Sequence, residues 1–451
     1  MGIDPVATAK RLLTLVALIG FTSLVLALGG DSGDQALATV LLGFILLAAY
    51  VAGAAAASVA LPRLTGYVLV GIVVGPYALG VFSEELVASL RTIDELALGL
   101  IALTAGGELK VHDLRKSLAS IVAISLGILA VVVIGMTGLV LALKPLAPLI
   151  AGESWSFAFA VALLLAIWSA NSSPDATIAV INETGARGEL TETILGATIL
   201  KDVLVIVLFA VALSLARPLV GEAAFDPGLI ATVGWEVGGA LAVGAFLGWA
   251  FSVYLQWQEE RGVLATLLFT YLLVLVAHQV HVELLLAAVG AGFVIENFSE
   301  AGDQLIDAIE ANALVVFAIF FALAGAALDL QTVAAFWPVA LVVVVARAAL
   351  TWAGARLGTG WAGSPVAVRR YGWMGLISQA GVTLGLSLLV ANEFPAWGDQ
   401  FVAVTTAVII VHLLVGPVLL KTALGRAGES GRPTAAAVAT PSVLPAAERA
   451  P

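Results

Sequence analysis

Apolar residues run along nearly the whole chain in stretches of 17 to 27 residues, interrupted by short polar segments. A bilayer core is crossed by about 20 residues of helix. The pattern therefore predicts an all-α polytopic membrane protein of about fourteen transmembrane helices. The predicted spans are 11–29, 36–61, 64–82, 93–109, 117–143, 156–181, 191–216, 228–256, 263–280, 284–298, 313–330, 333–359, 371–391 and 399–424.

Basic residues are distributed unevenly between the connections. If the N-terminus is cytoplasmic, thirteen Lys and Arg residues lie inside and only three lie outside. This asymmetry follows the positive-inside rule and supports an even number of spans, so we expect both termini in the cytoplasm. The inside set is Lys10, Arg11, Arg63, Lys110, Arg115, Lys116, Arg187, Arg261, Arg356, Arg369, Arg370, Lys421 and Arg426; the outside set is Arg91, Lys144 and Arg217.

The same pattern divides the chain into three parts. Residues 1–35 hold the first helix and its loop, and residues 36–424 form the main transmembrane domain. Residues 425–451 are rich in Ala, Pro, Gly and Ser and are predicted to be a disordered cytoplasmic tail.

Composition excludes several classes of protein. The chain has no Cys, which excludes disulfides and thiolate metal sites. Its net charge of −11 argues against nucleic-acid binding. Metal-ligand spacings, nucleophile elbows and phosphate-binding loops are missing from the sequence, so we expect neither an enzyme nor a cofactor.

Three short segments recur in the same order in the two halves of the chain. An offset of 219 residues carries Gly71 onto Gly290 and Gly106 onto Gly325, and a smaller offset carries residues 172–180 onto 378–386. The matched spans run in opposite directions across the membrane. Inverted repeats are typical of secondary transporters, whose site lies at the repeat interface.

Two spans are interrupted by polar residues at a similar depth. The sixth carries N-S-S-P-D at 171–175, where Pro174 removes a helix hydrogen bond. The thirteenth carries S-Q-A-G at 378–381. Such breaks are tolerated only inside protein or along an aqueous cavity. A pair of packed kinks is the alternative, and the matched depth favours a site.

Charged residues converge near that depth. Lys201 and Asp202 lie about 15 Å into the seventh span, and Arg347 lies halfway along the twelfth, so Asp175 can join them. Thr198 and Asp202 share one helix face. A structural ion pair between Lys201 and Asp202 is the alternative to a transport site, although such buried pairs seldom stabilise a fold over apolar packing.

Five segments of the chain together resemble one family. They are L-T-G-Y-V-L-V-G-I-V-V-G-P (64–76), S-S-P-D-A-T-I-A-V (172–180), L-K-D-V-L-V-I-V-L-F-A (200–210), F-F-A-L-A-G-A-A-L-D-L (320–330) and G-L-I-S-Q-A-G-V-T-L-G-L (375–386). In this order they resemble the monovalent cation:proton antiporters, in particular the branch of Kef-type and bacterial sodium–proton exchangers.

The resemblance implies a sodium–proton antiporter fold, in which a core with two crossed discontinuous helices lies beside a dimerisation scaffold. It implies that Asp202 alternately binds cation and proton, and that Arg347 partners acidic groups or the unwound segments. Ser172, Ser173, Asp175 and Thr198 fall at polar-ligand or break-supporting positions, and Gln379 belongs to the second break. Asp202, Thr198 and Ser173 are the expected cation ligands, since hard cations favour oxygen.

Lys201 departs from the family pattern, in which an Asp, Asn or Gln usually precedes the essential Asp. Two roles stay open for this lysine. It either carries the transported proton and releases it as a cation approaches, or holds Asp202 charged through a local pair. The second role favours one-for-one electroneutral exchange. The isolated His278, His281 and His412 are predicted to be structural or interfacial, with pH sensing as the alternative.

The sequence therefore predicts a secondary antiporter of the inner or plasma membrane, which exchanges Na⁺, or Li⁺ or K⁺, for H⁺ by alternating access. The expected partners are the cation, the proton, the lipid bilayer and a second copy in a homodimer. Two rivals stay open: a proton-coupled anion carrier using Lys201 and Arg347, and an ion channel on the same fold.

Overall fold

The computed structural model describes residues 34–83, 90–147, 149–221, 227–257, 263–299, 313–328 and 330–431, with residues 85 and 87 and most of 10–22. These residues form helices and connections, with no strand among them. The long helices and broken-helix segments are α2 (Asp34–Ser58), α3 (Arg63–Val74), α5 (Arg91–Glu108), α6 (Val111–Ala142), α7 (Trp155–Ala170), α8 (Pro174–Thr184), α9 (Glu189–Val220), α10 (Pro227–Trp257), α11 (Val263–Gln279), α12 (Leu284–Phe298), α14 (Ala313–Ala326), α15 (Leu330–Trp361), α17 (Gly381–Glu393) and α18 (Gly398–Ala427). Shorter helices are η1 (Lys144–Leu146), α16 (Val366–Tyr371) and η2 (Gly372–Leu376).

The predicted spans from the second to the fourteenth each coincide with a helix or broken helix. Six of these are long and apolar enough to cross a membrane, and the others are shorter. The third span is shorter than predicted, because Gly75-Pro76 ends α3 at Val74. Most of the first span lies outside the described residues, so fourteen crossings stay a prediction.

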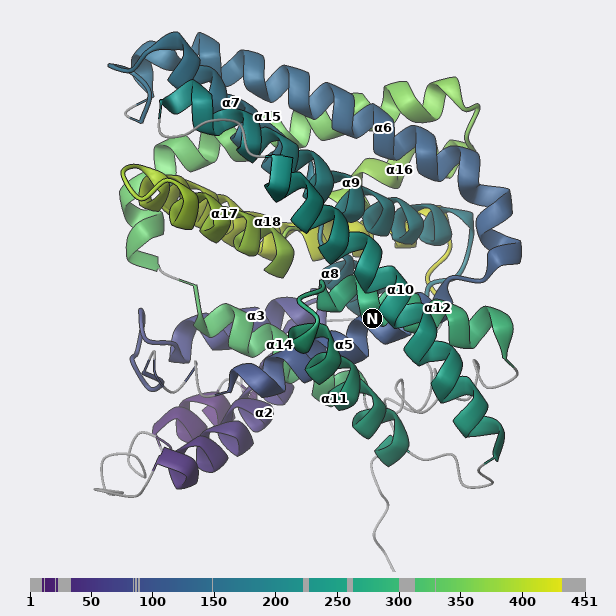
Figure 1. Ribbon diagram of the computed structural model, residues 1–451. Coiled ribbons are helices and arrows are strands. Elements are labelled where there is room, and N and C mark those ends of the chain that lie inside the picture. Colours follow the sequence, from purple (N-terminus) through teal and green to yellow (C-terminus); the bar gives the residue numbers. More distant parts are fainter. Residues whose placement is uncertain are drawn as a thin grey trace, which may run out of the picture.

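The helices form two bundles (Figure 1). The first, which we call the core bundle, contains α6 to α9 and α15 to α18 and occupies the upper part of the view. The second, the scaffold bundle, contains α2, α3, α5, α10, α11, α12 and α14. The bundles meet where α8 and α18 of the core pack against α3 and α5 of the scaffold, and where α9 packs against α10.

Glycines bring the scaffold helices into backbone contact. A methyl group on Gly71 of α3 would overlap the Ala322 carbonyl of α14, and one on Gly106 of α5 would overlap the Val289 carbonyl of α12. Small residues allow this close approach between membrane helices. We call the two contacts the glycine seams. The repeat offset carries α3 onto α12 and α5 onto α14, so each seam joins a helix of one half to a helix of the other.

The same offset relates two long helices of the core bundle, α6 and α15. α6 and α15 each contain 32 residues, and both their first and their last residues are 219 positions apart. They also pack closely, since a methyl group on Gly358 of α15 would overlap the Ala123 carbonyl of α6. The weak sequence repeat therefore corresponds to a repeat of helices.

The last described segment docks on the core. α18 continues through Ala427, beyond the predicted domain boundary at residue 424. Glu429 follows and accepts hydrogen bonds of 2.8 Å from the backbone N–H groups of Leu190 and Thr191, at the start of α9. Residues 432–451 of the predicted disordered tail lie outside the described residues.

Candidate functional site

Two interrupted helices of the core bundle meet at their breaks. The first break, Asn171 to Ser173, separates α7 from α8, and the second, Ile377 to Ala380, separates η2 from α17. The backbone N–H of Ser173 donates a 2.9 Å hydrogen bond to the carbonyl oxygen of Ser378. We call this meeting point the crossing. Both interruptions were predicted, and the structure brings them together.

Arg347 of α15 ties the two breaks to one another. Its fully buried guanidinium donates to the carbonyl oxygens of Ser169 (2.7 Å), Asn171 (2.5 Å) and Ile377 (2.7 Å). Carbonyl groups at helix ends have no intrahelical partner, and a planar, multidentate guanidinium can satisfy several at once. The predicted partnership of Arg347 is thus with the unwound segments rather than with an acidic side chain.

The first break is organised by its own residues. Pro174 starts α8, where its missing N–H is harmless, and the Ser173 hydroxyl caps the helix by accepting from the Ala176 N–H at 3.2 Å. The Ser173 hydroxyl also donates to Asp175 Oδ1. The structure therefore places Ser173 and Asp175 together and uses Ser173 to support the break.

The second break is held by a chain of buried polar groups. Gln379 donates from Nε2 to the carbonyl oxygen of Trp168 at 3.3 Å, and its Oε1 lies 3.0 Å from His412 Nδ1. The Trp168 indole donates to the Thr383 carbonyl and the Ser387 hydroxyl, each at 2.9 Å. Gln379 and His412 are therefore structural partners of the crossing.

Lys201 and Asp202 of α9 are both fully buried, but only Lys201 has a hydrogen-bond partner in the described chain. The Lys201 amine donates a 2.7 Å hydrogen bond to the Ser172 hydroxyl in the first break. Both Asp202 carboxylate oxygens are buried without a hydrogen-bond partner in the described part of the chain, where no ion pair joins Asp202 to Lys201. The local pair that the sequence left open is not formed.

Thr198 lies one turn before Asp202, as predicted. Its hydroxyl donates to the Ile194 carbonyl of its own helix at 2.7 Å, which leaves oxygen lone pairs free to accept. A hydrogen bond from the hydroxyl to the carbonyl four residues earlier is common for a buried Thr in a helix.

Unpartnered oxygens gather around the first break. Besides both oxygens of Asp202, the described residues leave Ser169 Oγ, Asn171 Oδ1 and Asp175 Oδ2 buried without partners. Buried oxygens are normally satisfied, so such a group needs an explanation. Carboxylate, amide and hydroxyl oxygens are the ligands that hard cations favour. Across the described residues, no three His, Cys, Asp or Glu side chains are arranged to hold a metal ion.

A narrow apolar recess opens beside Asp175, where the core and scaffold bundles meet. It is lined by Leu98, Ile101 and Ala102 of α5, by Pro174, Asp175 and Ile178 of α8, and by Leu285 and Val289 of α12. Asp175 is the ionisable member of this lining.

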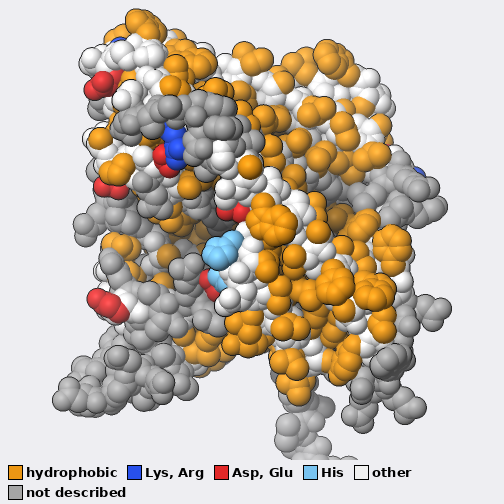
Figure 2. Space-filling model, in the orientation of Figure 1, with side chains coloured by type: hydrophobic (Ala, Val, Ile, Leu, Met, Phe, Trp, Pro, Cys, Tyr) orange, Lys and Arg blue, Asp and Glu red, His pale blue; other side chains and the backbone are white. Residues whose placement is uncertain are grey.

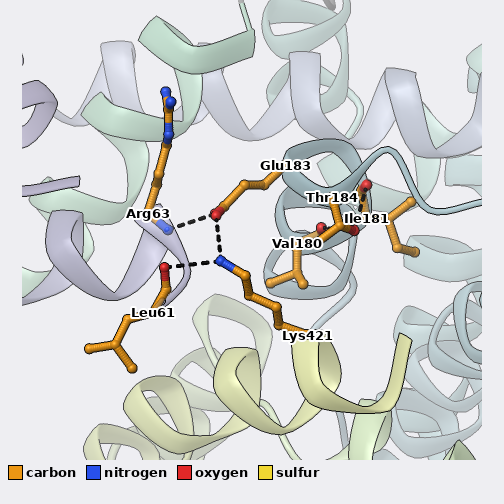
Figure 3. Close-up of polar contacts among 7 residues, drawn as sticks. All are labelled: Leu61, Arg63, Val180, Ile181, Glu183, Thr184 and Lys421. Atoms are coloured by element: carbon orange, nitrogen blue, oxygen red, sulfur yellow. Dashed lines mark hydrogen bonds and ion pairs between the residues drawn. The ribbon is translucent and has the colours of Figure 1, made fainter. Parts of the chain in front are cut away.

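The bundles are also joined through the far end of α8. Figure 3 shows Glu183, which accepts from the Arg63 backbone N–H at 2.6 Å and lies 3.1 Å from the Lys421 amine. Lys421 donates in addition to the Leu61 carbonyl at 3.1 Å. The Lys421–Glu183 ion pair itself joins α8 and α18 of the core. We call it the interbundle ion pair, because each of its members also binds the scaffold backbone at the start of α3, Glu183 at Arg63 and Lys421 at Leu61.

Several residues at the site were not singled out from the sequence. Ser169, Thr383 and Ser387 are ordinary hydroxyl residues in apolar helices, and no spacing distinguishes them. Asn171 lies inside the N-S-S-P-D break, which was the available signal. Glu283, the N-cap of α12, lies two residues before Leu285 of the recess although it is far from Asp175 in sequence.

Comparisons with known proteins agree with this architecture. The chain is 31% identical over 174 residues to the probable Na⁺/H⁺ antiporter GerT of Bacillus cereus, a match that covers 38% of this chain and 42% of that protein. It is 24% identical over 399 residues to the Na⁺/H⁺-K⁺ antiporter GerN of the same organism, covering 84% of this chain and 95% of GerN.

A solved structure of the sodium proton antiporter MjNhaP1 from Methanocaldococcus jannaschii has the same fold. It matches with a TM-score of 0.66 and 16% identity over 89% of this chain and all of that chain. A second structure of the same antiporter gives a TM-score of 0.68 and 17% identity. The predicted antiporter fold is thus confirmed. The family model "sodium/hydrogen exchanger, transmembrane" matches residues 43–425. The chain is therefore a member of the transmembrane sodium/hydrogen exchanger family, within the monovalent cation:proton antiporters.

Proposed function

We propose that the protein exchanges a monovalent cation for H⁺ by alternating access, with Na⁺ as the first candidate and Li⁺ or K⁺ as alternatives. The observation that carries the proposal is the Asp202 carboxylate, which is fully buried beside the crossing without a hydrogen-bond partner in the described chain. A buried carboxylate is strongly destabilised unless its charge is compensated. A bound cation or a bound proton compensates it, and the two exclude each other.

This competition gives the exchange. When the site faces high cation concentration, Asp202 releases its proton and binds the cation, with Asp175, Asn171 and Ser169 as sources of further oxygens. When the site faces the other side, a proton displaces the cation. One cation replaces one proton, so the site keeps the same charge and the cycle is electroneutral.

Lys201 supports this stoichiometry through its position. The Lys201–Asp202 dipeptide contains one carboxylate, that of Asp202, and this group takes part in the competition between cation and proton. The Lys201 amine is bound to Ser172 instead of to Asp202. We propose that Lys201 holds the first break in place and adjusts the cation affinity of Asp202 by its charge.

The core bundle is the moving part in this proposal. It holds both breaks, Lys201 and Asp202, and it meets the scaffold through few elements. The scaffold would form the contact with a second copy, and the protein would lie in the cell membrane with both termini in the cytoplasm.

The anion-carrier alternative is disfavoured by the basic residues themselves. The Arg347 guanidinium donates to backbone carbonyls instead of facing a ligand, and the Lys201 amine already donates to Ser172.

Proton flux in proteoliposomes with an imposed pH gradient tests the proposal. Na⁺, Li⁺, K⁺ and Rb⁺ are added in turn to wild type, to Asp202→Asn and to Lys201→Ala. We expect cation-driven collapse of the gradient in wild type, none in Asp202→Asn, and altered ion preference or electrogenicity in Lys201→Ala. A normal rate in Asp202→Asn would refute the site. Flux that needs an anion but no alkali cation would support the anion carrier, and flux without stoichiometric proton movement would support a channel.

A further inference from the structure

Glu283, the residue directly before α12, lies beside α10. Its backbone N–H donates to the Glu236 carbonyl oxygen at 3.2 Å, and its Oε2 accepts from the Leu286 N–H at 2.6 Å. Glu236 is nine residues into α10, which is about 14 Å of helix from Pro227. The start of α12 therefore lies deeper in the predicted membrane than the outer end of α10.

The turn above Glu283 is polar and open to solvent. His278 and Gln279, which end α11, and His281, which follows, are exposed, and His278 Nε2 lies 3.6 Å from Glu95 Oε1. Figure 2 shows histidine side chains beside carboxylates near the centre of this face, which is otherwise largely hydrophobic to one side. Glu236 and Glu283 are themselves partly exposed. Carboxylates thus form a polar edge beside an apolar surface.

On its other side, Glu283 adjoins the crossing. Leu285, two residues along α12, lines the recess that also contains Asp175. Asp175 Oδ2 is buried without a partner in the described chain, and Lys201, the neighbour of Asp202, donates to Ser172 in the same break. Glu283 is therefore the partly exposed carboxylate next to the helix that lines the recess with Asp175.

The capping role of Glu283 does not require this residue type. Ser, Thr, Asp and Asn are the preferred N-caps, and each is shorter. A Glu side chain is longer than these caps and carries a negative charge. Negative charge beside apolar surfaces concentrates cations.

From this arrangement we infer that Glu283 is the access carboxylate of the antiporter: it receives the cation on the predicted outer side and delivers it to Asp202. The inference rests on the proposed cation exchange. If Glu283 has this role, its charge affects the apparent affinity for cations that arrive from the predicted outer side. The exchange of cation and proton itself takes place at Asp202.

Three substitutions separate the charge from the cap. Glu283→Ser keeps a preferred cap without the charge, Glu283→Asp keeps both, and Glu283→Gln keeps the side-chain length without the charge. Initial rates against Na⁺ concentration are measured in vesicles of both orientations, with unfolding temperatures in detergent as the test of folding. Glu153→Gln is the control, because Glu153 is an exposed carboxylate in the predicted outer loop before α7.

We expect Glu283→Ser and Glu283→Gln to raise KM for Na⁺ on the order of tenfold from the predicted outer side, with little change from the other side. Glu283→Asp should restore most of the affinity, and Glu153→Gln should match wild type. A wild-type KM in Glu283→Ser would overturn the inference, as would an equal change from both sides. Failure of the proposed function looks different, since wild type itself would then show no cation-driven proton flux.

Discussion

The backbone N–H of Ser173 donates to the carbonyl oxygen of Ser378, and this hydrogen bond joins the two broken helices backbone to backbone at their breaks. Each break leaves helix-end carbonyls that the membrane cannot solvate. Arg347 supplies the missing donors to both sides of the crossing. The crossing therefore depends on a side chain whose hydrogen bonds, in the described chain, go to backbone carbonyls.

Arg347→Ala should unfold at a clearly lower temperature and lose transport. It leaves the carbonyls of Ser169, Asn171 and Ile377 without this donor, and each unsatisfied buried carbonyl costs roughly 1–3 kcal/mol. Arg347→Lys should recover only part of the stability, because an ammonium cannot span the same carbonyls. Thermal unfolding in detergent measures the loss.

Arg356→Ala is the matched control for Arg347. Arg356 lies on the same helix but is exposed, with its guanidinium 5.6 Å from the Trp352 ring centre. Its removal should change the unfolding temperature little. An equal loss in the two variants would mean that any arginine on α15 is needed and that the crossing is not special.

Lys421→Ala should favour conformations in which the bundles separate at the interbundle ion pair. The pair is partly exposed, so its loss shifts the equilibrium by about 1 kcal/mol or less, or up to roughly fivefold in population. The chain has no Cys, so Ile178→Cys in the recess can be labelled selectively with a maleimide. We expect faster labelling when Lys421→Ala is added.

The control for this experiment is Arg217→Ala, which removes a 2.6 Å ion pair with Glu393 inside the core bundle. Labelling of Ile178→Cys should stay at the wild-type rate. If Lys421→Ala also left the rate unchanged, the interbundle ion pair would have no influence on opening.

Glu429→Ala should loosen the first turn of α9. Gly188 at the N-cap has no side chain to offer, and the Glu429 carboxylate caps the helix instead, accepting from Leu190, Thr191 and the Thr191 hydroxyl. Loss of a cap costs about 0.5–2 kcal/mol. Hydrogen exchange at residues 190 and 191 should accelerate, while Glu189→Gln, an exposed change in the same turn, should have little effect.

Gly358→Ala should destabilise the core through the contact between α6 and α15. The added methyl overlaps the Ala123 carbonyl, and such overpacking costs about 1–3 kcal/mol. Gly360→Ala on the same helix meets nothing within 4 Å and should be neutral or slightly stabilising. Unfolding temperatures of the two variants give the comparison; identical values would contradict the close packing.

Much of the fold follows from the sequence. Hydrophobic runs locate the helices, and Pro174 and the polar group at 378–381 mark the breaks, because a membrane tolerates so few interruptions. The residues of the crossing were predicted for the same reason. The unwound segments were one of the two partners expected for Arg347. The partner of Lys201 was not predicted, since the direction of its amine towards Ser172 depends on how α7, α8 and α9 pack. Glu283 was missed because its relation to Asp202 exists only in three dimensions.

The glycine seams have a consequence for biosynthesis. α3 and α5 leave the ribosome long before α12 and α14, which are the helices that fill their seams. Until then, Gly71 and Gly106 lack the helices that they contact in the folded protein. The glycine seams can therefore form only late in synthesis. A chain cut between α9 and α10 would yield two fragments, each of which needs the other to complete these helix contacts.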